Sequence, residues 1–194
     1  MKINVMNQER YKRASQFFIF SIILTILAGI VTFIIHPELK NGAGDSLEST
    51  GLTKVWDYIK NNGILVPLQM FILAFIPVPF LYMANIVVTT IALGFFIGIA
   101  LHLDVYQGVG LTIASLPHTF VEIFAYCLLA ALLFELNRSI RMILRNNFRK
   151  NKKETSFTQI ATDTIKVYLV FVLPFIIIAA FLETYIADAI FQLF

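Results

Sequence analysis

The sequence predicts an all-α integral membrane protein, and three observations lead to this fold class. Hydrophobic residues make up 58% of the 194 residues, and the mean hydropathy is +0.79. Charged residues make up only 14%, which is too few to cover a soluble globule with polar surface. Several runs of about 20 apolar residues occur, the length that a helix needs to cross a hydrocarbon layer of roughly 30 Å. We therefore predict a single membrane domain over residues 1–194 with about five transmembrane helices.

The first predicted span covers residues 14–35. Basic residues precede it, as in a secretory signal. The apolar run is longer than the core of a signal peptide, so we interpret it as a membrane span. Pro37 follows the run and disfavours helical geometry at the residue before it, so the span should end there. Residues 36–62 are polar, and Trp56 belongs to a set of apolar residues at helical spacing. Two interpretations remain open: an amphipathic helix on the membrane surface, or a loop that Trp56 anchors.

The second predicted span, residues 64–84, contains Pro67, Pro77 and Pro79. Proline removes a helical hydrogen bond and clashes with the preceding turn, so this span should kink or break. An unpaired carbonyl costs several kcal/mol in hydrocarbon, so a break near Pro77 and Pro79 must be covered by protein or water.

The third predicted span, residues 86–101, carries Gly94 and Gly98 in a G-x-x-x-G pair. This spacing lets two helix backbones approach closely and predicts a helix-packing site. Residues 102–110 are expected to form a short loop, and the fourth span covers residues 112–136.

A basic segment over residues 138–153 follows the fourth span. Its arginines recur three and four residues apart, which predicts an amphipathic cytoplasmic helix that binds anionic lipid or an acidic partner: Arg138, Arg141, Arg145 and Arg149. Glu135 is expected to pair with Arg138 at the membrane surface. The fifth span covers residues 167–187 and should bend or break at Pro174.

The positive charges also predict the orientation of the chain. Twelve of the fifteen Lys and Arg residues lie before the first span or between the fourth and fifth spans. Because cytoplasmic loops carry the excess of Lys and Arg, we expect a cytoplasmic N-terminus and an extracytoplasmic C-terminus. These cations flank membrane spans, so the basic pI near 9.0 predicts contact with membrane lipids and no nucleic-acid partner.

Four polar residues lie within the predicted membrane-spanning region: Asn85, His118, Glu122 and Glu183. Ionisable groups at this depth are costly, so they are candidates for function. One hypothesis is a buried polar cluster that locks the helices together through hydrogen bonds. The competing hypothesis is that His118, Glu122 and Glu183 relay protons or bind a metal.

Signatures of catalysis are missing from the sequence. It contains no H-E-x-x-H zinc motif, no G-x-S-x-G nucleophile motif and no phosphate-binding glycine loop. The lone Cys127 cannot form a disulfide or a thiolate metal cluster within one chain. We therefore expect no enzymatic activity, no cofactor and no metal site.

Three segments resemble the stage II sporulation protein M (SpoIIM) family. The run Pro117-His118-Thr119-Phe120-Val121-Glu122 is similar to the P-H-G-[IV]-[FI]-E element of that family. Asn85 before a span with Gly94 and Gly98 is similar to its central helix, and Ala179-Ala180-Phe181-Leu182-Glu183 is similar to its last span. The resemblance covers roughly residues 70–190.

The resemblance implies a non-catalytic, multi-pass protein of the bacterial cytoplasmic membrane that acts in a complex. What the resemblance implies is a scaffold or accessory role. Members of that family act beside an ABC transporter, as in bacteriocin export and immunity, or beside an envelope enzyme in sporulation-like morphogenesis. A membrane protein partner or a homo-oligomer is therefore expected. From the residues alone, the alternative is a small ion-coupled transporter or channel that uses the buried His and Glu.

Overall fold

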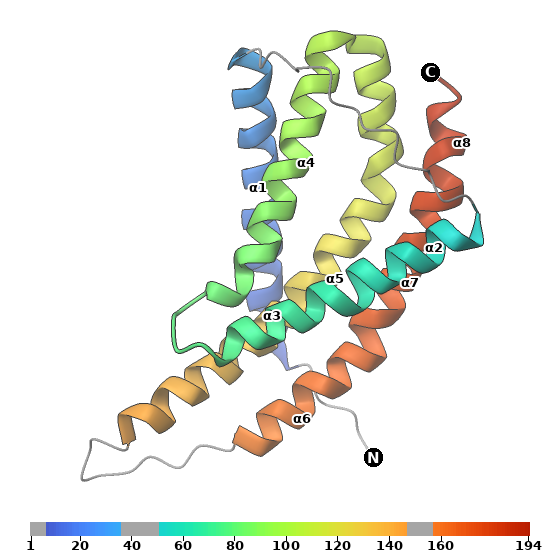
Figure 1. Cartoon of the computed structure of the whole chain (residues 1–194). Helices are drawn as coiled ribbons and strands as arrows, with labels where there is room; N and C mark the ends of the chain where they lie inside the picture. The colour runs from blue at the N-terminus through green and yellow to red at the C-terminus, as the bar shows by residue number, and fades with distance from the viewer. Residues whose placement is uncertain (1–6, 36–50, 147–156) are drawn as a thin grey trace.

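The computed structural model of the chain describes residues 7–35, 51–146 and 157–194, and these residues form five helical rods (Figure 1). Two rods are single α-helices and three contain π- or 3₁₀-helical parts. The elements in chain order are α1 (Gln8–Ile35), α2 (Leu52–Tyr58), η1 (Ile59–Leu65), α3 (Val66–Phe75), η2 (Leu81–Met83), α4 (Ala84–Leu103), α5 (Val105–Asn146), α6 (Phe157–Val167), η3 (Tyr168–Val172), α7 (Leu173–Phe181), η4 (Leu182–Ile186) and α8 (Ala187–Phe191). The predicted all-α membrane fold is confirmed.

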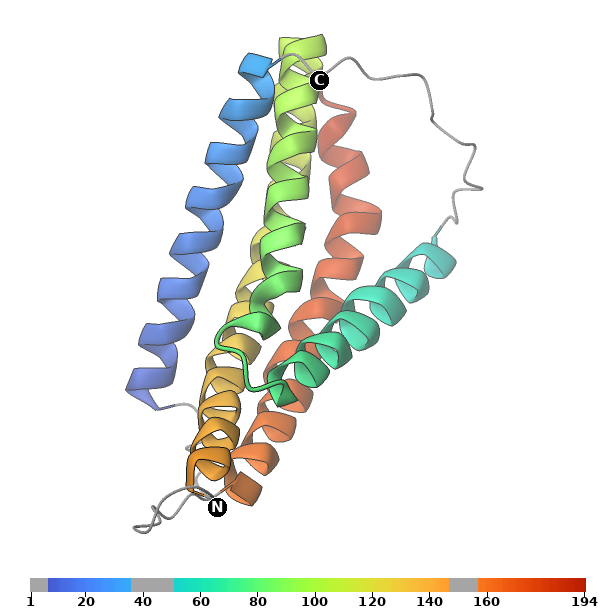
Figure 2. The same cartoon turned by 60° about the vertical axis from the view of Figure 1, so that its left-hand side comes forward.

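Four of the rods are long and apolar enough to cross a membrane: Gln8–Ile35, Leu81–Leu103, Val105–Arg145 and Phe157–Phe191. The remaining rod, from α2 through α3, is not among them. It begins about half-way along the bundle and runs obliquely across α5 and α7 (Figures 1 and 2). Residues 64–84 of the predicted second span therefore do not form one helix: they fall in the rod that begins at Leu52 and ends at Phe75, in the segment 76–80, and in the start of the next rod. Of the two interpretations of residues 36–62, the structure supports a helix for residues 52–62, and this helix packs on the bundle, whereas residues 36–50 lie outside the described residues.

The predicted break at Pro77 and Pro79 is confirmed, since both lie in the non-helical segment 76–80 between α3 and η2. Pro174 does not end its rod, but the π-helical η3 interrupts the α-helix just before it, and the rod changes direction between α6 and α8 (Figure 1). Pro174 occupies the first turn of α7 directly after the π-helical η3, and Pro67 likewise follows the π-helical η1. A π-helical turn widens the backbone where the proline ring would otherwise clash with the turn before it, so the rod continues.

The predicted loop at 102–110 is also absent, because α4 and α5 are joined at Asp104 alone. The Asp104 side chain accepts a hydrogen bond of 3.1 Å from the Gln107 backbone and so caps the start of α5. Helix α5 then includes the fourth span and the described part of the basic segment in one piece. Residues 147–153 of that segment, with Arg149, lie outside the described residues.

Helices α1 and α4 approach closely at the two glycines of the G-x-x-x-G pair. A Cβ atom added at Gly94 would lie 2.2 Å from the Thr25 carbonyl oxygen, and one added at Gly98 would lie 2.5 Å from the Gly29 carbonyl oxygen. Only glycine permits this contact between backbones. The packing partner of the pair is therefore α1.

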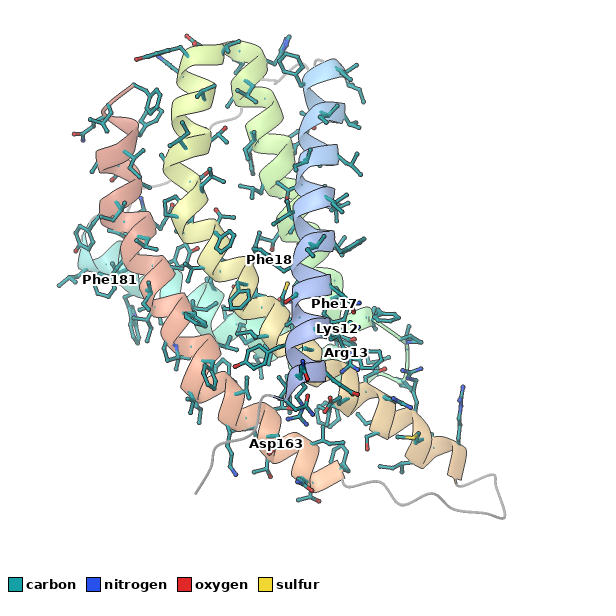
Figure 3. The ribbon with its side chains drawn as sticks, turned by 180° about the vertical axis from the view of Figure 1, so that it is seen from behind. Lys12, Arg13, Phe17, Phe18, Asp163 and Phe181 are labelled. Atoms are coloured by element: carbon teal, nitrogen blue, oxygen red, sulfur yellow. The ribbon has the colours of Figure 1, made fainter. Side chains whose placement is uncertain are left out.

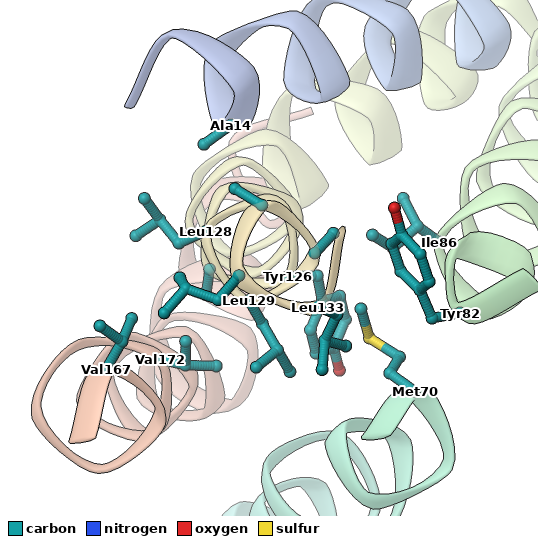
Figure 4. Close-up of a cluster of buried hydrophobic side chains, with 14 of the residues drawn as sticks. Ala14, Met70, Tyr82, Ile86, Tyr126, Leu128, Leu129, Leu133, Val167 and Val172 are labelled. Atoms are coloured by element: carbon teal, nitrogen blue, oxygen red, sulfur yellow. The ribbon is translucent and has the colours of Figure 1, made fainter. Parts of the chain in front are cut away.

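Helix α5 forms the centre of the bundle. Residues 125–133 are all buried, which happens because α1, α3, α4 and the last rod surround this stretch. Figure 4 shows Leu129 and Leu133 of α5 beside Met70 of α3 and Val172 of η3. A helix that is apolar on every side suits this enclosed position.

The two ends of the bundle differ in charge. The N-terminal part of α1 and the C-terminal part of α5 lie at one end, whereas α8 ends at the other (Figures 1 and 2). Figure 3 shows Lys12 and Arg13 of α1 and Asp163 of α6 near the first of these ends. We call it the cationic end, because the described arginines of α1 and α5 gather there: Arg10, Arg13, Arg138, Arg141 and Arg145.

Candidate functional site

An ion pair joins the middle of α5 to the last rod. The Nε2 atom of His118 lies 2.6 Å from an Oε2 atom of Glu183 in η4, and the side chains are 12% and 27% exposed. His118 lies 17 residues before Glu135 at the cationic end, which is about 25 Å along the helix. The pair therefore lies deep in the membrane-spanning region and clamps α5 to η4.

Glu122 lies one turn after His118 on α5 and meets the oblique rod. The Tyr58 hydroxyl of α2 donates a hydrogen bond to the Glu122 carboxylate. Glu122 is buried and also interacts electrostatically with His118 and Glu183. The structure thus brings His118, Glu122 and Glu183 together and adds Tyr58, which sequence reasoning missed.

Two further tyrosines bind backbone carbonyls of η1. Tyr168 of η3 donates a hydrogen bond of 2.6 Å to the Gly63 carbonyl, and Tyr126 of α5 donates one of 2.9 Å to the Asn62 carbonyl. Pro67 has no N–H, so it cannot donate the α-helical hydrogen bond to Gly63, four residues earlier. The tyrosines therefore supply donors where the irregular backbone of η1 needs them.

Asn137 performs the same task where α3 ends. Its side-chain amide donates hydrogen bonds of 3.0 Å to the Ala74 carbonyl and 2.7 Å to the Ile76 carbonyl. Its Oδ1 atom accepts a bond of 3.0 Å from Nε of Arg141, and the residue is 1% exposed. The sequence predicts that protein or water covers this break but does not identify Asn137. The available signal is an asparagine that directly follows an apolar span.

Asn85 has other partners than the His–Glu group. Its amide donates a hydrogen bond of 3.0 Å to Oε1 of Gln69 and one of 3.4 Å to the Val66 carbonyl. Asn85 therefore connects α4 to α3 and does not contact His118, Glu122 or Glu183 through a described hydrogen bond. We use the term polar lock for these inter-helix contacts as a set: Tyr58–Glu122, Tyr126–Asn62, Tyr168–Gly63, Asn137–Ala74, Asn137–Ile76, Asn85–Gln69 and His118–Glu183.

Glu135 forms its ion pairs with α1 and not with Arg138, so the predicted Glu135–Arg138 pair is wrong. Its carboxylate lies 2.7 Å from Arg10 and 3.3 Å from Arg13, and Arg10 also lies 3.4 Å from Asp163. The packing of α1 on α5 places these two arginines closer to Glu135 than Arg138 is. Arg138 and Arg145 are exposed, which leaves them available to lipid headgroups or a partner.

Within residues 7–35, 51–146 and 157–194, no group of three or more His, Cys, Asp or Glu side chains is arranged so that it could hold a metal ion. Cys127 is a free, buried thiol. Burial of the thiol keeps it away from solvent in the folded protein, so it can report unfolding.

Comparison with known proteins identifies the family. The model of the family described as stage II sporulation protein M matches residues 14–188, which is most of the chain and includes both the His118–Glu122 element and Glu183. No curated protein and no solved structure matches the chain. The matched region contains all four membrane-crossing rods except the ends of the first and last. The chain therefore belongs to the stage II sporulation protein M (SpoIIM) family.

Proposed function

We propose that the protein is a non-catalytic scaffold or accessory subunit of a membrane complex in the bacterial cytoplasmic membrane. Its partner would be a transporter or an envelope enzyme, or a second copy of the chain. The observation that carries the proposal is a polar helix face on the oblique rod that no described part of the chain covers.

This polar face belongs to α2 and η1. Asp57, Lys60 and Asn61 are exposed and Lys54 is half-buried. Lys54, Asp57 and Asn61 are spaced three, four and seven residues apart, and Lys60 follows Asp57 by three, so they lie toward one side of the helix. Tyr58, between them in sequence, points instead to Glu122.

The contact with Glu122 fixes the depth of the polar face. Glu122 lies 18 residues after Asp104 and 13 residues before Glu135, or about 27 Å and 20 Å along α5. Lys54 also interacts electrostatically with Glu183. The polar face therefore lies near the middle of the bilayer. A charge that faces acyl chains there costs about 2.5–3.5 kcal/mol, so this face requires protein or water against it.

The orientation in the membrane follows from the charges. The cationic end contains the described arginines of α1 and α5 and should face the cytoplasm. The end of α8 then faces outside. In this orientation Arg138 and Arg145 meet the anionic cytoplasmic leaflet or an acidic partner.

Affinity purification from membranes in mild detergent, with quantitative mass spectrometry, tests the proposal. We expect the wild-type chain to co-purify with a membrane partner, or with a second copy of itself, in a fixed molar proportion. The triple variant Asp57→Leu, Lys60→Leu, Asn61→Leu should recover at least tenfold less of that partner, because its apolar face no longer requires polar groups packed against it. The control variant Leu68→Ala, on the apolar part of the same rod, should keep it. Recovery of the chain alone, or equal recovery by the triple variant, would contradict the proposal.

A second candidate function is a small ion-coupled transporter, in which water and not protein covers the polar face. One observation favours it: Nδ1 of His118 is buried and has no hydrogen-bond partner within the described residues, so it needs a partner such as the water that lines an ion pathway. Proteoliposomes with the purified chain decide between the two. Proton flux that Glu183→Gln abolishes would support transport, and the absence of flux with intact partner binding would support the accessory role.

A further inference from the structure

An apolar groove opens between α1 and the start of α4, close to the cationic end. Its volume is about 580 Å³. It is lined by Phe17 and Phe20 of α1, by residues 78–81, and by Met83, Ala84 and Val87. Phe20, Val78 and Phe80 are each about half exposed, so the groove is open to the membrane.

Positively charged side chains lie at the cytoplasmic mouth of this groove. Arg13 lies one helical turn before Phe17, and its guanidinium lies 4.2 Å from the centre of the Phe134 ring. The Phe134 ring in turn lies 5.9 Å from the ring of Phe80, which lines the groove. Figure 3 shows Lys12 and Arg13 beside Phe17 on α1.

The opposite wall brings a further cation. Arg141 donates a hydrogen bond of 3.0 Å to Asn137, whose amide binds the carbonyl of Ile76, two residues before the groove-lining Val78. Glu135 offsets part of this charge through its pair with Arg13, but Lys12 is exposed and forms no described ion pair. The mouth of the groove therefore keeps a net positive charge.

We propose that this groove binds an anionic phospholipid of the inner leaflet. One acyl chain lies along Phe17, Phe20 and Phe80, and the phosphate lies at the mouth near Lys12, Arg13 and Arg141. An acyl chain is the occupant because an apolar groove that opens into the bilayer already faces lipid. The cations select the headgroup, since basic pockets between membrane helices on the cytoplasmic side bind anionic lipids. This site is separate from the polar face of α2, so it rests on the proposed orientation in the membrane but not on the proposed accessory role.

Native mass spectrometry of the purified chain tests this site, with phosphatidylglycerol and phosphatidylcholine of identical acyl chains as the two probes. We expect the wild-type chain to retain phosphatidylglycerol in preference to phosphatidylcholine. Lys12→Gln should reduce phosphatidylglycerol retention about fivefold, since a cation near the surface contributes about 1 kcal/mol. Ala84→Trp, which fills the groove, should reduce retention of both lipids.

The control is Lys166→Gln, which removes an exposed cation at the same end from α6, away from the groove. It should leave retention unchanged. Equal retention of the two lipids by the wild-type chain, or an equal loss in Lys12→Gln and Lys166→Gln, would overturn the proposal. Intact melting behaviour of Lys12→Gln would show that any loss of lipid is not a folding defect.

Discussion

Replacing Asn137 by leucine should destabilise the protein by about 1–3 kcal/mol, because the Ala74 carbonyl loses its donor in a buried position, whereas the Ile76 carbonyl keeps a hydrogen bond of 2.8 Å from the Val78 backbone. Each buried carbonyl without a partner costs about 1–3 kcal/mol. Cys127 provides the measurement, since it is the single cysteine and is buried in the folded chain. A thiol-reactive fluorescent maleimide should therefore react at a lower temperature with Asn137→Leu than with the wild-type protein.

Asn61→Leu is the matched control for this substitution. Asn61 is exposed, and its described side-chain hydrogen bond is to the neighbouring Asn62. Its loss should change the melting temperature little. If Asn137→Leu melted at the same temperature as Asn61→Leu, Asn137 would not hold the end of α3.

Removing one partner of the His118–Glu183 pair should destabilise the protein by about 2–4 kcal/mol, since a charge without its partner remains at bilayer depth. The two side chains are partly exposed, which places the effect at the lower part of the range for buried pairs. Glu183→Gln should cost less than Glu183→Ala, because glutamine keeps a polar atom within reach of the imidazole.

The double-mutant cycle with His118→Ala and Glu183→Ala isolates the interaction. We expect a coupling energy of about 1–3 kcal/mol, measured from the same thiol-reactivity melts. Additive single effects would show that the two residues do not interact in the folded protein. Glu135→Ala with His118→Ala serves as a control pair, because Glu135 contacts α1 and not His118.

The sequence predicts the fold class well because a membrane protein must show its spans as apolar runs. It also predicts the break at Pro77 and Pro79, since proline acts locally. The oblique rod is different. Lys60, Asn61 and Asn62 lower its hydropathy, and local pattern alone leaves a surface helix and a loop open, whereas the tyrosines that support this helix come from α5 and η3.

The polar residues show the same division between local and long-range information. The spacing of His118 and Glu122 predicts that they share a face of one helix, which depends only on helical geometry. The partners of Glu135 and Asn85 depend on which helices pack together, and the sequence of one chain does not state this. Arg10 and Gln69 are therefore found only in the structure. The proline predicts a bend or break near Pro174, but the π-helical turn of η3 that lets the rod continue has no simple sequence signature.

The central claim is that the oblique rod packs against α7 within the bundle, held there by the polar lock. A Cβ atom added at Gly63 would lie 3.5 Å from Cγ2 of Ile176, an atom bonded to the Ile176 Cβ, so the two positions are close enough to test for a disulfide, which requires a Cβ separation of roughly 3.5–4.5 Å. The most direct test is oxidation of Gly63→Cys with Ile176→Cys in membranes, on a Cys127→Ala background, followed by counting free thiols with a maleimide of known mass. We predict that this pair forms a disulfide and leaves no free thiol, whereas Ile64→Cys with Ile176→Cys, displaced by one exposed position, leaves two. Two free thiols in the Gly63 pair, or a disulfide in both pairs, would contradict the packing of this rod.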